Sequence, residues 1–406
     1  MTAFDALKVI PFRHFLFARF SLIFSVQMQN LILSWLVYDI TKDPLSLGLI
    51  GIAEVIPFLV VVLFAGNMAD QYSRKKMVIY ATLPIVCASL ILLFLAINQS
   101  SLKPSILLSG YFSVVIVIGL ARGFFGPASQ AMVPNLVPSS VFANATTWNT
   151  TAFHIAAIIG PAFGGLIFGF GQASISMSVI LAMQLLSLLL YITLSDHQVY
   201  AQRKDESVIK RLKEGIKFVF NNQVIIASLS LDLFAVLFGG ATALLPVFAV
   251  EVYHCGAEGL GLLRAAPAVG AVLMAVLIMI KPPGKGAGKI LLVSVAAFGL
   301  CMIAFALSKN LYVSFAILAL SGAVDNVSVV IRQTLVQSNT PDEMRGRVAS
   351  VNSVFIGLSN EIGSFESGLA AKIFGLVPSV IYGGLATIGI VAATAKVAPK
   401  LRAMDM

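Results

Sequence analysis

The stretch GNMADQYSRKK, residues 66–76, lies between two long apolar runs at residues 45–66 and 77–98. Its glycine permits a tight exit from a preceding helix. It then places one acid, Asp70, before a basic cluster that begins at Arg74. Because a helix needs about 20 apolar residues to cross a bilayer, we interpret residues 66–76 as a loop between two membrane-spanning helices.

The composition extends this interpretation to the whole chain. Of its 406 residues, 58% are hydrophobic and only 11% are charged, whereas soluble proteins carry about 25% charged residues. These values exclude a cytosolic enzyme and a nucleic-acid-binding protein, and the net charge of +9 resides in loops rather than on one continuous face. Three scattered cysteines are too few for a disulfide framework or a zinc site. We expect no catalytic residues, no metal and no cofactor.

Twelve apolar runs are long enough to cross a membrane as helices, and they do not alternate as the strands of a membrane barrel do. The runs lie near residues 14–38, 45–66, 77–98, 105–126, 149–170, 174–194, 223–250, 258–280, 288–307, 311–331, 349–373 and 377–396. The sequence therefore predicts an all-α membrane protein with twelve transmembrane helices.

The loops between the runs predict the orientation. Twenty of the 27 Lys and Arg residues fall on the side of the two termini, four fall on the other side, and three lie inside runs. Because cytoplasmic loops are enriched in Lys and Arg, both termini are expected in the cytoplasm. The longest polar interval, residues 195–222, has apolar residues at helical spacing and predicts an amphipathic helix along the cytoplasmic membrane surface. It separates two expected six-helix bundles, residues 1–194 and 223–406.

The two halves of the chain repeat each other. A shift of 203 residues aligns identical residues between positions 130 and 166, including Asn149 with Asn352 and Gly160 with Gly363. Two related six-helix halves with a binding site between them are the architecture of secondary transporters. We therefore expect two pseudo-symmetric bundles.

Two motifs resemble those of the major facilitator superfamily. The loop at residues 66–76 resembles the signature loop between the second and third helices of that family. The resemblance implies that Gly66, Asp70 and Arg74 form a latch that closes the cytoplasmic side, with a solvated loop acid as the alternative. Residues 122–126, with an intramembrane arginine four residues before a glycine, are similar to the fourth-helix motif of the same family.

The fifth apolar run carries a third motif. Gly160, Pro161, Gly164 and Gly165 resemble the Gly-Pro signature of the antiporter branch, although the upstream glycines of that signature are missing. Ordinary packing of small residues explains these positions equally well. Longer stretches, including residues 359–368, are similar to the drug and siderophore exporters of the superfamily.

Eight charged residues fall within or near the apolar runs, where one charge costs at least about 2.5–3.5 kcal/mol. They are Arg19, Glu54, Arg122, Asp232, Arg264, Asp325, Glu361 and Glu366. The shift of 203 aligns Arg122 with Asp325, and a shift of 210 aligns Glu54 with Arg264. These alignments predict two gating pairs across the halves that form in alternation. Alternatively, each charge pairs within its own half and only stabilises the fold.

Glu361 is the leading candidate for carrying a proton. It lies in the middle of its run, and no basic residue shares that segment, so its carboxyl is expected to be poorly solvated. The further candidates for proton coupling or for lining the central cavity are Glu54, Glu366, Asp232, Arg19 and His154. For His154 the alternative is an interior histidine held by hydrogen bonds.

These features predict a proton-coupled exporter of amphiphilic small molecules, either drugs or a siderophore, that works by alternating access. The alternatives are an importer or a lysophospholipid flippase of the same fold and, from another class, a non-transporting membrane receptor or assembly subunit. The expected partners are a small-molecule substrate, protons and the lipid bilayer, with no nucleic acid. The protein is expected to be a monomer in a bacterial inner membrane.

Overall fold

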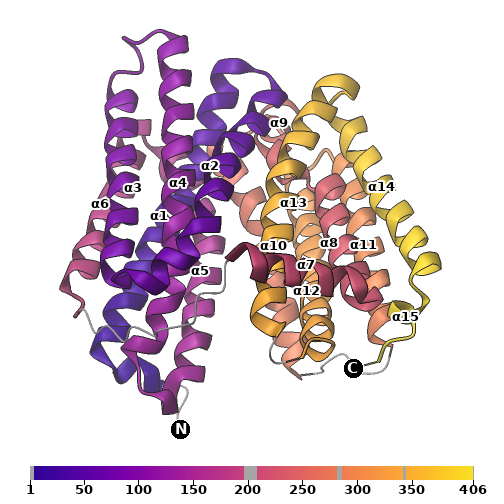
Figure 1. The fold of residues 1–406 in the computed structure, drawn as a ribbon. Helices are drawn as coiled ribbons and strands as arrows, with labels where there is room; N and C mark the ends of the chain where they lie inside the picture. Colours follow the sequence, from indigo (N-terminus) through magenta and orange to yellow (C-terminus); the bar gives the residue numbers. More distant parts are fainter. Residues whose placement is uncertain (1–3, 196–207, 281–285, 342–343, 406) are drawn as a thin grey trace. The chain divides into compact units, whose positions relative to one another are not determined.

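The computed structural model describes residues 4–195, 208–280, 286–341 and 344–405, and the regular elements in these ranges are helices (Figure 1). The chain divides into two compact units. Unit 1 comprises Met1–Thr41 and Ala53–Asp205, and unit 2 comprises Lys42–Ile52 and Glu206–Met406. Each unit is described by itself below.

The helices of the first half are η1 (Asp5–Lys8), α1 (Ile10–Thr41), α2 (Pro44–Gln71), α3 (Arg74–Ile97), α4 (Pro104–Leu136), η2 (Ser139–Val141), α5 (Phe142–Phe170) and α6 (Ala173–Thr193). Those of the second half are α7 (Val208–Asn221), α8 (Gln223–Gly239), η3 (Ala241–Leu244), α9 (Leu245–Glu251), α10 (Ala257–Ile280), α11 (Ala287–Leu307), α12 (Leu311–Ser338), α13 (Arg345–Phe374), α14 (Leu376–Val397) and α15 (Pro399–Arg402).

The prediction of a twelve-helix membrane fold is confirmed. Eleven helical segments of the described chain are long and apolar enough to cross a membrane, and the segment Gln223–Glu251 joins α8, η3 and α9 into one of them. The twelfth is α13, which has 30 residues but a lower mean hydropathy because it carries Glu361, Glu366 and several serines. The protein is therefore a multi-pass membrane protein.

The internal repeat appears as the same set of neighbours in both units. In unit 1, α1 packs against α5 and α6, while α3 packs against α4 and α6. In unit 2, α8 packs against α13 and α14, while α11 packs against α12 and α14. Equivalent helices of the two halves thus take equivalent places in their own bundles, as the shift of 203 residues predicts.

Glycines allow the closest helix crossings. A Cβ atom on Gly322 of α12 would overlap the main chain of Pro267 in α10, and one on Gly270 of α10 would overlap the main chain of Ala319 in α12. Small residues at a crossing let two backbones approach, which favours helix association in a membrane. These crossings fix α10 against α12 and so orient the polar face of α12 within unit 2.

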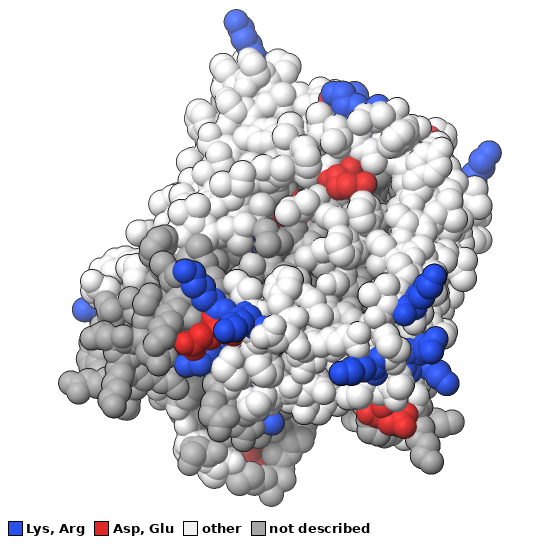
Figure 2. All heavy atoms as spheres, turned by 45° about the vertical axis from the view of Figure 1, so that its right-hand side comes forward, with Lys and Arg blue, Asp and Glu red and all other residues white. Residues whose placement is uncertain are grey.

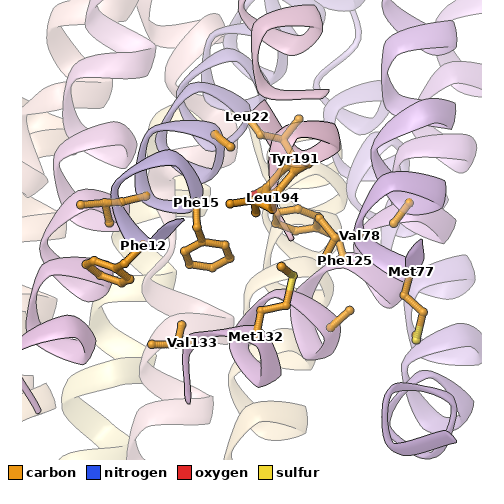
Figure 3. Packing of buried hydrophobic residues seen from close by; sticks show 14 of the residues in the cluster. Phe12, Phe15, Leu22, Met77, Val78, Phe125, Met132, Val133, Tyr191 and Leu194 are labelled. Carbon is orange, nitrogen blue, oxygen red and sulfur yellow. The ribbon is translucent and has the colours of Figure 1, made fainter. Parts of the chain in front are cut away.

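The core of unit 1 combines side chains from α1, α3, α4 and α6. Phe15, Phe125 and Tyr191 form edge-on ring contacts with centroids 6.1–6.2 Å apart (Figure 3). Leu22, Val78 and Met132 belong to the same buried cluster. Aromatic pairs in this geometry contribute about 0.5–1.5 kcal/mol beyond their burial.

The beginning of α2 belongs to unit 2 because it packs against α13. A Cβ atom on Gly48 would lie 2.8 Å from the Cα of Phe365, and one on Gly368 would lie 2.8 Å from the carbonyl oxygen of Pro44. The two backbones are therefore in direct contact. The sequence suggested that the first bundle comprises residues 1–194 without interruption. In the structure, residues 42–52 instead group with the second half, because the glycine-lined crossing holds them against α13.

The interval that joins the two halves ends in a helix, α7, as the spacing of its apolar residues predicts. Its Val219 is completely buried with residues of α8, α12 and α13, and Arg347 of α13 forms an ion pair with Glu214 at 2.5 Å. Part of the apolar face of α7 therefore packs against the other helices of unit 2. Residues 196–207 lie outside the described ranges.

Charged side chains are sparse on the protein surface. Figure 2 shows one face on which Lys, Arg, Asp and Glu occupy small separate patches, with uncharged residues over most of the rest. Many large apolar side chains, such as Phe94, Leu273 and Tyr312, are more than half exposed. Exposed apolar surface on this scale is suited to contact with lipid.

Candidate functional site

Glu54 and Arg122 form an ion pair within unit 1. Glu54 lies on α2 with 8% of its surface exposed, and Arg122 of α4 donates a hydrogen bond to its Oε1. The pair is possible because Gly119 and Gly123, on the same side of α4, let the backbone of α2 approach closely. A charge-assisted contact of this kind satisfies an acid that lipid could not solvate.

Asp232 and Arg332 form the corresponding ion pair of unit 2. Asp232 lies on α8 and Arg332 on α12, and their side chains are only 11% and 5% exposed. The apolar run was expected to end at residue 331, which would place Arg332 in a loop. The helix end is wrong, since α12 continues to Ser338 and Arg332, Leu335 and Val336 are buried.

Both ion pairs join residues of the same half, as the alternative interpretation of the charges expects. The pairs across the halves, Arg122 with Asp325 and Glu54 with Arg264, stay predictions. Asp325 lies seven residues before Arg332, on the same face of α12. Among the described residues, Asp325 has neither a hydrogen bond nor an ion pair.

Arg264 and Glu361 interact electrostatically within unit 2. Arg264 lies on α10, and the opposite charge that acts on it is that of Glu361 on α13. Glu361 also lies against α2, because a Cβ atom on Gly51 would be 3.0 Å from its Oε2. Glu361 therefore has a basic neighbour from another helix, which its own sequence segment did not reveal.

Arg19 has no acidic partner among the described residues. It lies on α1 and donates a hydrogen bond from Nη1 to the Oδ1 of Asn149 on α5. Its Nε is buried and makes no hydrogen bond to the described chain, and the same holds for the hydroxyl of the nearby Tyr191. Within the described chain, the guanidinium is thus hydrogen-bonded to a neutral amide and its charge is not balanced, which leaves it available to an anionic group.

Glu366 and His154 complete the predicted set. Glu366 of α13 is half-buried, and it makes no hydrogen bond or ion pair with the described residues. His154 of α5 is exposed, and its ring packs edge-on against Phe153 at a centroid distance of 5.6 Å. The alternative, that His154 is an interior histidine held by hydrogen bonds, is therefore wrong because the side chain is exposed.

The basic cluster after α2 anchors the ends of neighbouring helices. Arg74 Nη1 donates a hydrogen bond to the carbonyl of Ala131 in the last turns of α4, at 2.7 Å. Lys75 Nζ donates one to the carbonyl of Ile192 in the last turn of α6, at 2.8 Å. Cations near helix C-termini satisfy free carbonyls and interact favourably with the helix dipole. α2 continues to Gln71 and α3 begins at Arg74, so the prediction of a loop that begins at Gly66 is wrong. The surroundings of Gly66 and Asp70 lie outside the described part of the structure.

The Gly-Pro motif packs α5 against α1. A Cβ atom on Gly160 would lie 2.9 Å from the carbonyl oxygen of Phe24, and one on Gly164 would lie 3.0 Å from the Cα of Met28. Pro161 lies inside α5, and Gly165 is buried. The motif therefore sets a close helix contact, and any direct part in antiport stays a prediction.

An ion pair that was not predicted joins the residue before α2 to the last turn of α13. Lys372 Nζ donates a hydrogen bond to Oδ2 of Asp43 at 2.6 Å. This hydrogen bond lowers the pKa of the Asp43 carboxyl below its ordinary value. Asp43 follows one apolar run and Lys372 lies at the end of another. The sequence could have suggested the pair only because both positions were expected on the outer side of the membrane.

Comparison with known proteins identifies the family. The family model described as Major Facilitator Superfamily matches residues 15–364. The chain belongs to this superfamily. Members of the Major Facilitator Superfamily are transporters, which agrees with the expectation of a transport protein rather than an enzyme.

Several relatives match the chain over most of its length. The Staphyloferrin A transporter of Staphylococcus aureus is 22% identical over 384 residues, which is 93% of each chain. Enterobactin exporter EntS of Citrobacter koseri is 25% identical over 391 residues, covering 95% of this chain and 91% of that protein. A Na(+), Li(+), K(+)/H(+) antiporter of Planococcus maritimus is 25% identical over 79% of this chain and 82% of its own.

Solved structures share the fold. The crystal structure of a POT family transporter in complex with 5-aminolevulinic acid superposes with a TM-score of 0.75 and 12% identity, covering 96% of both chains. At this identity the likeness concerns the fold alone. It agrees with the prediction of two six-helix bundles typical of the Major Facilitator Superfamily.

Proposed function

We propose that this protein is a proton-coupled exporter of amphiphilic small molecules, with a siderophore as the leading cargo class. The observation that carries the proposal is one arginine–acid pair inside each unit, Glu54 with Arg122 and Asp232 with Arg332, in a chain of the transporter superfamily. Intramembrane charges are expensive and mark substrate or ion pathways in membrane proteins. Three relatives, a Staphyloferrin A transporter, an enterobactin exporter and a cation/proton antiporter, support this proposal.

The transport cycle that we propose is alternating access. The two bundles rock around a central substrate site, and the charge pairs across the halves, Arg122 with Asp325 and Glu54 with Arg264, form in alternation at the two ends. Asp70 with Gly66 and Arg74 acts as the cytoplasmic latch. Intramembrane acids, with Glu361 among the leading candidates, take up and release the proton.

The cargo that fits best carries an acidic group. Arg19 provides a partly buried guanidinium whose described hydrogen-bond partner is the neutral Asn149. A carboxylate or an ionised catechol on the cargo would balance this charge and form a bidentate contact. Arg19→Lys keeps the charge but loses the planar guanidinium that can donate two parallel hydrogen bonds. We therefore expect weaker cargo binding in Arg19→Lys and the loss of binding in Arg19→Gln.

Transport into inverted membrane vesicles tests the proposal. The vesicles are loaded with an acidic interior and offered enterobactin, staphyloferrin A and a panel of amphiphilic dyes. We expect uptake of at least one of these compounds, and its loss when a protonophore collapses the gradient or when Arg122 is replaced by Gln. Uptake only in right-side-out vesicles would show an importer, and movement of labelled lysophospholipid instead would show a flippase. Either result would refute the proposal.

A further inference from the structure

Unit 2 contains a small cavity enclosed by three of its helices. The cavity is lined by Asp232, Ala235 and Val236 of α8, by Ser294, Val295 and Phe298 of α11, and by Asp325 and Ser328 of α12. Its free space is about that needed by a single water molecule. Each helix contributes residues one helical turn apart, so the cavity is a feature of the bundle itself and lies within one unit.

The two carboxyl groups of this cavity differ in their partners. Asp232 is held by Arg332, which lies one turn beyond Ser328 on α12. Asp325 is half-buried, yet among the described residues it has no hydrogen bond or ion pair. A carboxylate held between three mainly apolar helices is unfavourable unless its charge is compensated.

When Asp325 is ionised, the cavity has one negative charge that is not compensated, so one positive charge has to be bound there. Asp232 and Arg332 offset each other, whereas Asp325 has no counter-charge among the described residues of unit 2. A metal cation would need several oxygen ligands, and it would meet the nearby guanidinium of Arg332. A proton needs only one carboxylate oxygen of Asp325, and the hydroxyls of Ser294 and Ser328 can exchange hydrogen bonds with the acid through one water molecule.

We propose that this cavity is a proton-binding site in which Asp325 is the acceptor, and that the Asp232–Arg332 pair holds the other acid of the cavity permanently ionised. The inference rests on the proposed function, because it names the place at which the second bundle takes up the coupling proton. It assigns this role to α12, whereas the sequence favoured Glu361 on α13.

The other titratable groups near α12 do not face the cavity. On α10, which packs against α12, Arg264 has Glu361 as its electrostatic neighbour, and Glu258 lies in the first helical turn. On α11, Lys289 and Cys301 are not part of the cavity wall. Of the charged groups on these helices, Asp232 of α8 is the one that lines the cavity together with Asp325, and Arg332 of α12 is paired with Asp232.

Infrared difference spectroscopy on the purified full-length protein tests this assignment. The absorption of protonated carboxyl groups is recorded while the pH is raised. We expect a band that disappears on titration in the wild type, is absent in Asp325→Asn, and remains in Glu366→Gln. Glu366 is a matched comparison because it is another acid of unit 2 without a hydrogen bond or ion pair in the described ranges, and it lies outside the cavity. Loss of the band in Glu366→Gln with retention in Asp325→Asn would overturn the proposal.

Two further measurements keep the test decisive. If Asp325→Asn does not fold, Asp325→Glu should retain the band with a shifted titration midpoint, whereas an unchanged midpoint would place the proton elsewhere. Replacement of choline by Na⁺ at constant ionic strength should leave the band unchanged, and a Na⁺-dependent shift would show a metal-cation site instead. Because protonation is read without any cargo, failure here is distinguishable from failure of the vesicle experiment, which tests export itself.

Discussion

Replacement of Gly119 by alanine should separate α2 from α4 and weaken the Glu54–Arg122 pair without altering either charged residue. A Cβ atom at Gly119 would lie 3.0 Å from the carbonyl carbon of Glu54 and 3.2 Å from its Cα, with the carbonyl oxygen closer still. These are main-chain atoms, so no rotamer change can relieve the overlap. An ordinary contact requires at least 3.4 Å, and the helices would have to move apart by about 1 Å.

The expected magnitude follows from two opposing effects. Overpacking of a well-packed interior costs typically about 1–3 kcal/mol, while alanine in a helix interior is more stable than glycine by roughly 0.5–1 kcal/mol. Gly126 of α4 provides a matched control, because a Cβ atom there would have no atom within 4 Å. The gain from alanine is common to both variants, so we expect Gly119→Ala to be less stable than Gly126→Ala by the overpacking cost alone, about 1–3 kcal/mol.

Thermal and SDS-induced unfolding in detergent, followed by circular dichroism, measures this difference, and the vesicle assay measures transport in the same two variants. Gly126→Ala should keep wild-type transport, and Gly119→Ala should lose most of it. If Gly119→Ala were as stable as Gly126→Ala and transported normally, the close crossing of α2 and α4 would not position the ion pair, and the reasoning would be refuted.

Three further outcomes are expected. Arg332→Leu should destabilise the protein by about 3–5 kcal/mol, because it leaves Asp232 buried and unpaired. The double variant with Asp232→Leu should regain most of the lost stability in unfolding experiments. No recovery of stability would argue against the pair. Because the pKa of Asp43 is lowered in the folded protein, its contact with Lys372 stabilises the fold at pH values above the ordinary carboxyl pKa. This stabilisation is lost as the pH falls through the lowered pKa. The effect is about 0–1 kcal/mol for so exposed a pair, and Lys372→Met should abolish this part of the pH dependence of thermal stability. Tyr191→Phe should be neutral or stabilising by about 1 kcal/mol, since the hydroxyl has no hydrogen-bond partner in the described chain; a large loss of stability would show that the hydroxyl is satisfied.

The helices themselves followed from the sequence because each is a local property. A run of about 20 apolar residues must form a helix in lipid, where every backbone polar group has to be satisfied within its own segment. Even α13, whose polar residues lower its hydropathy, was located by its length and by its place in the repeat. The end of α12 was missed because Arg332 was taken as a boundary, whereas a buried partner on α8 lets the helix continue past it.

The sequence by itself determined that this chain spans a membrane twelve times in two repeated halves, since hydrophobicity and periodicity act along the chain and need no neighbours. It also identified the charged residues whose burial had to be compensated. Only the tertiary structure decided which partners compensate them: Glu54 for Arg122, Asp232 for Arg332, Glu361 as the electrostatic neighbour of Arg264, and no acid of the described chain for Arg19. Partner choice depends on which helix faces meet, and these are set by glycine crossings between segments that are distant in sequence.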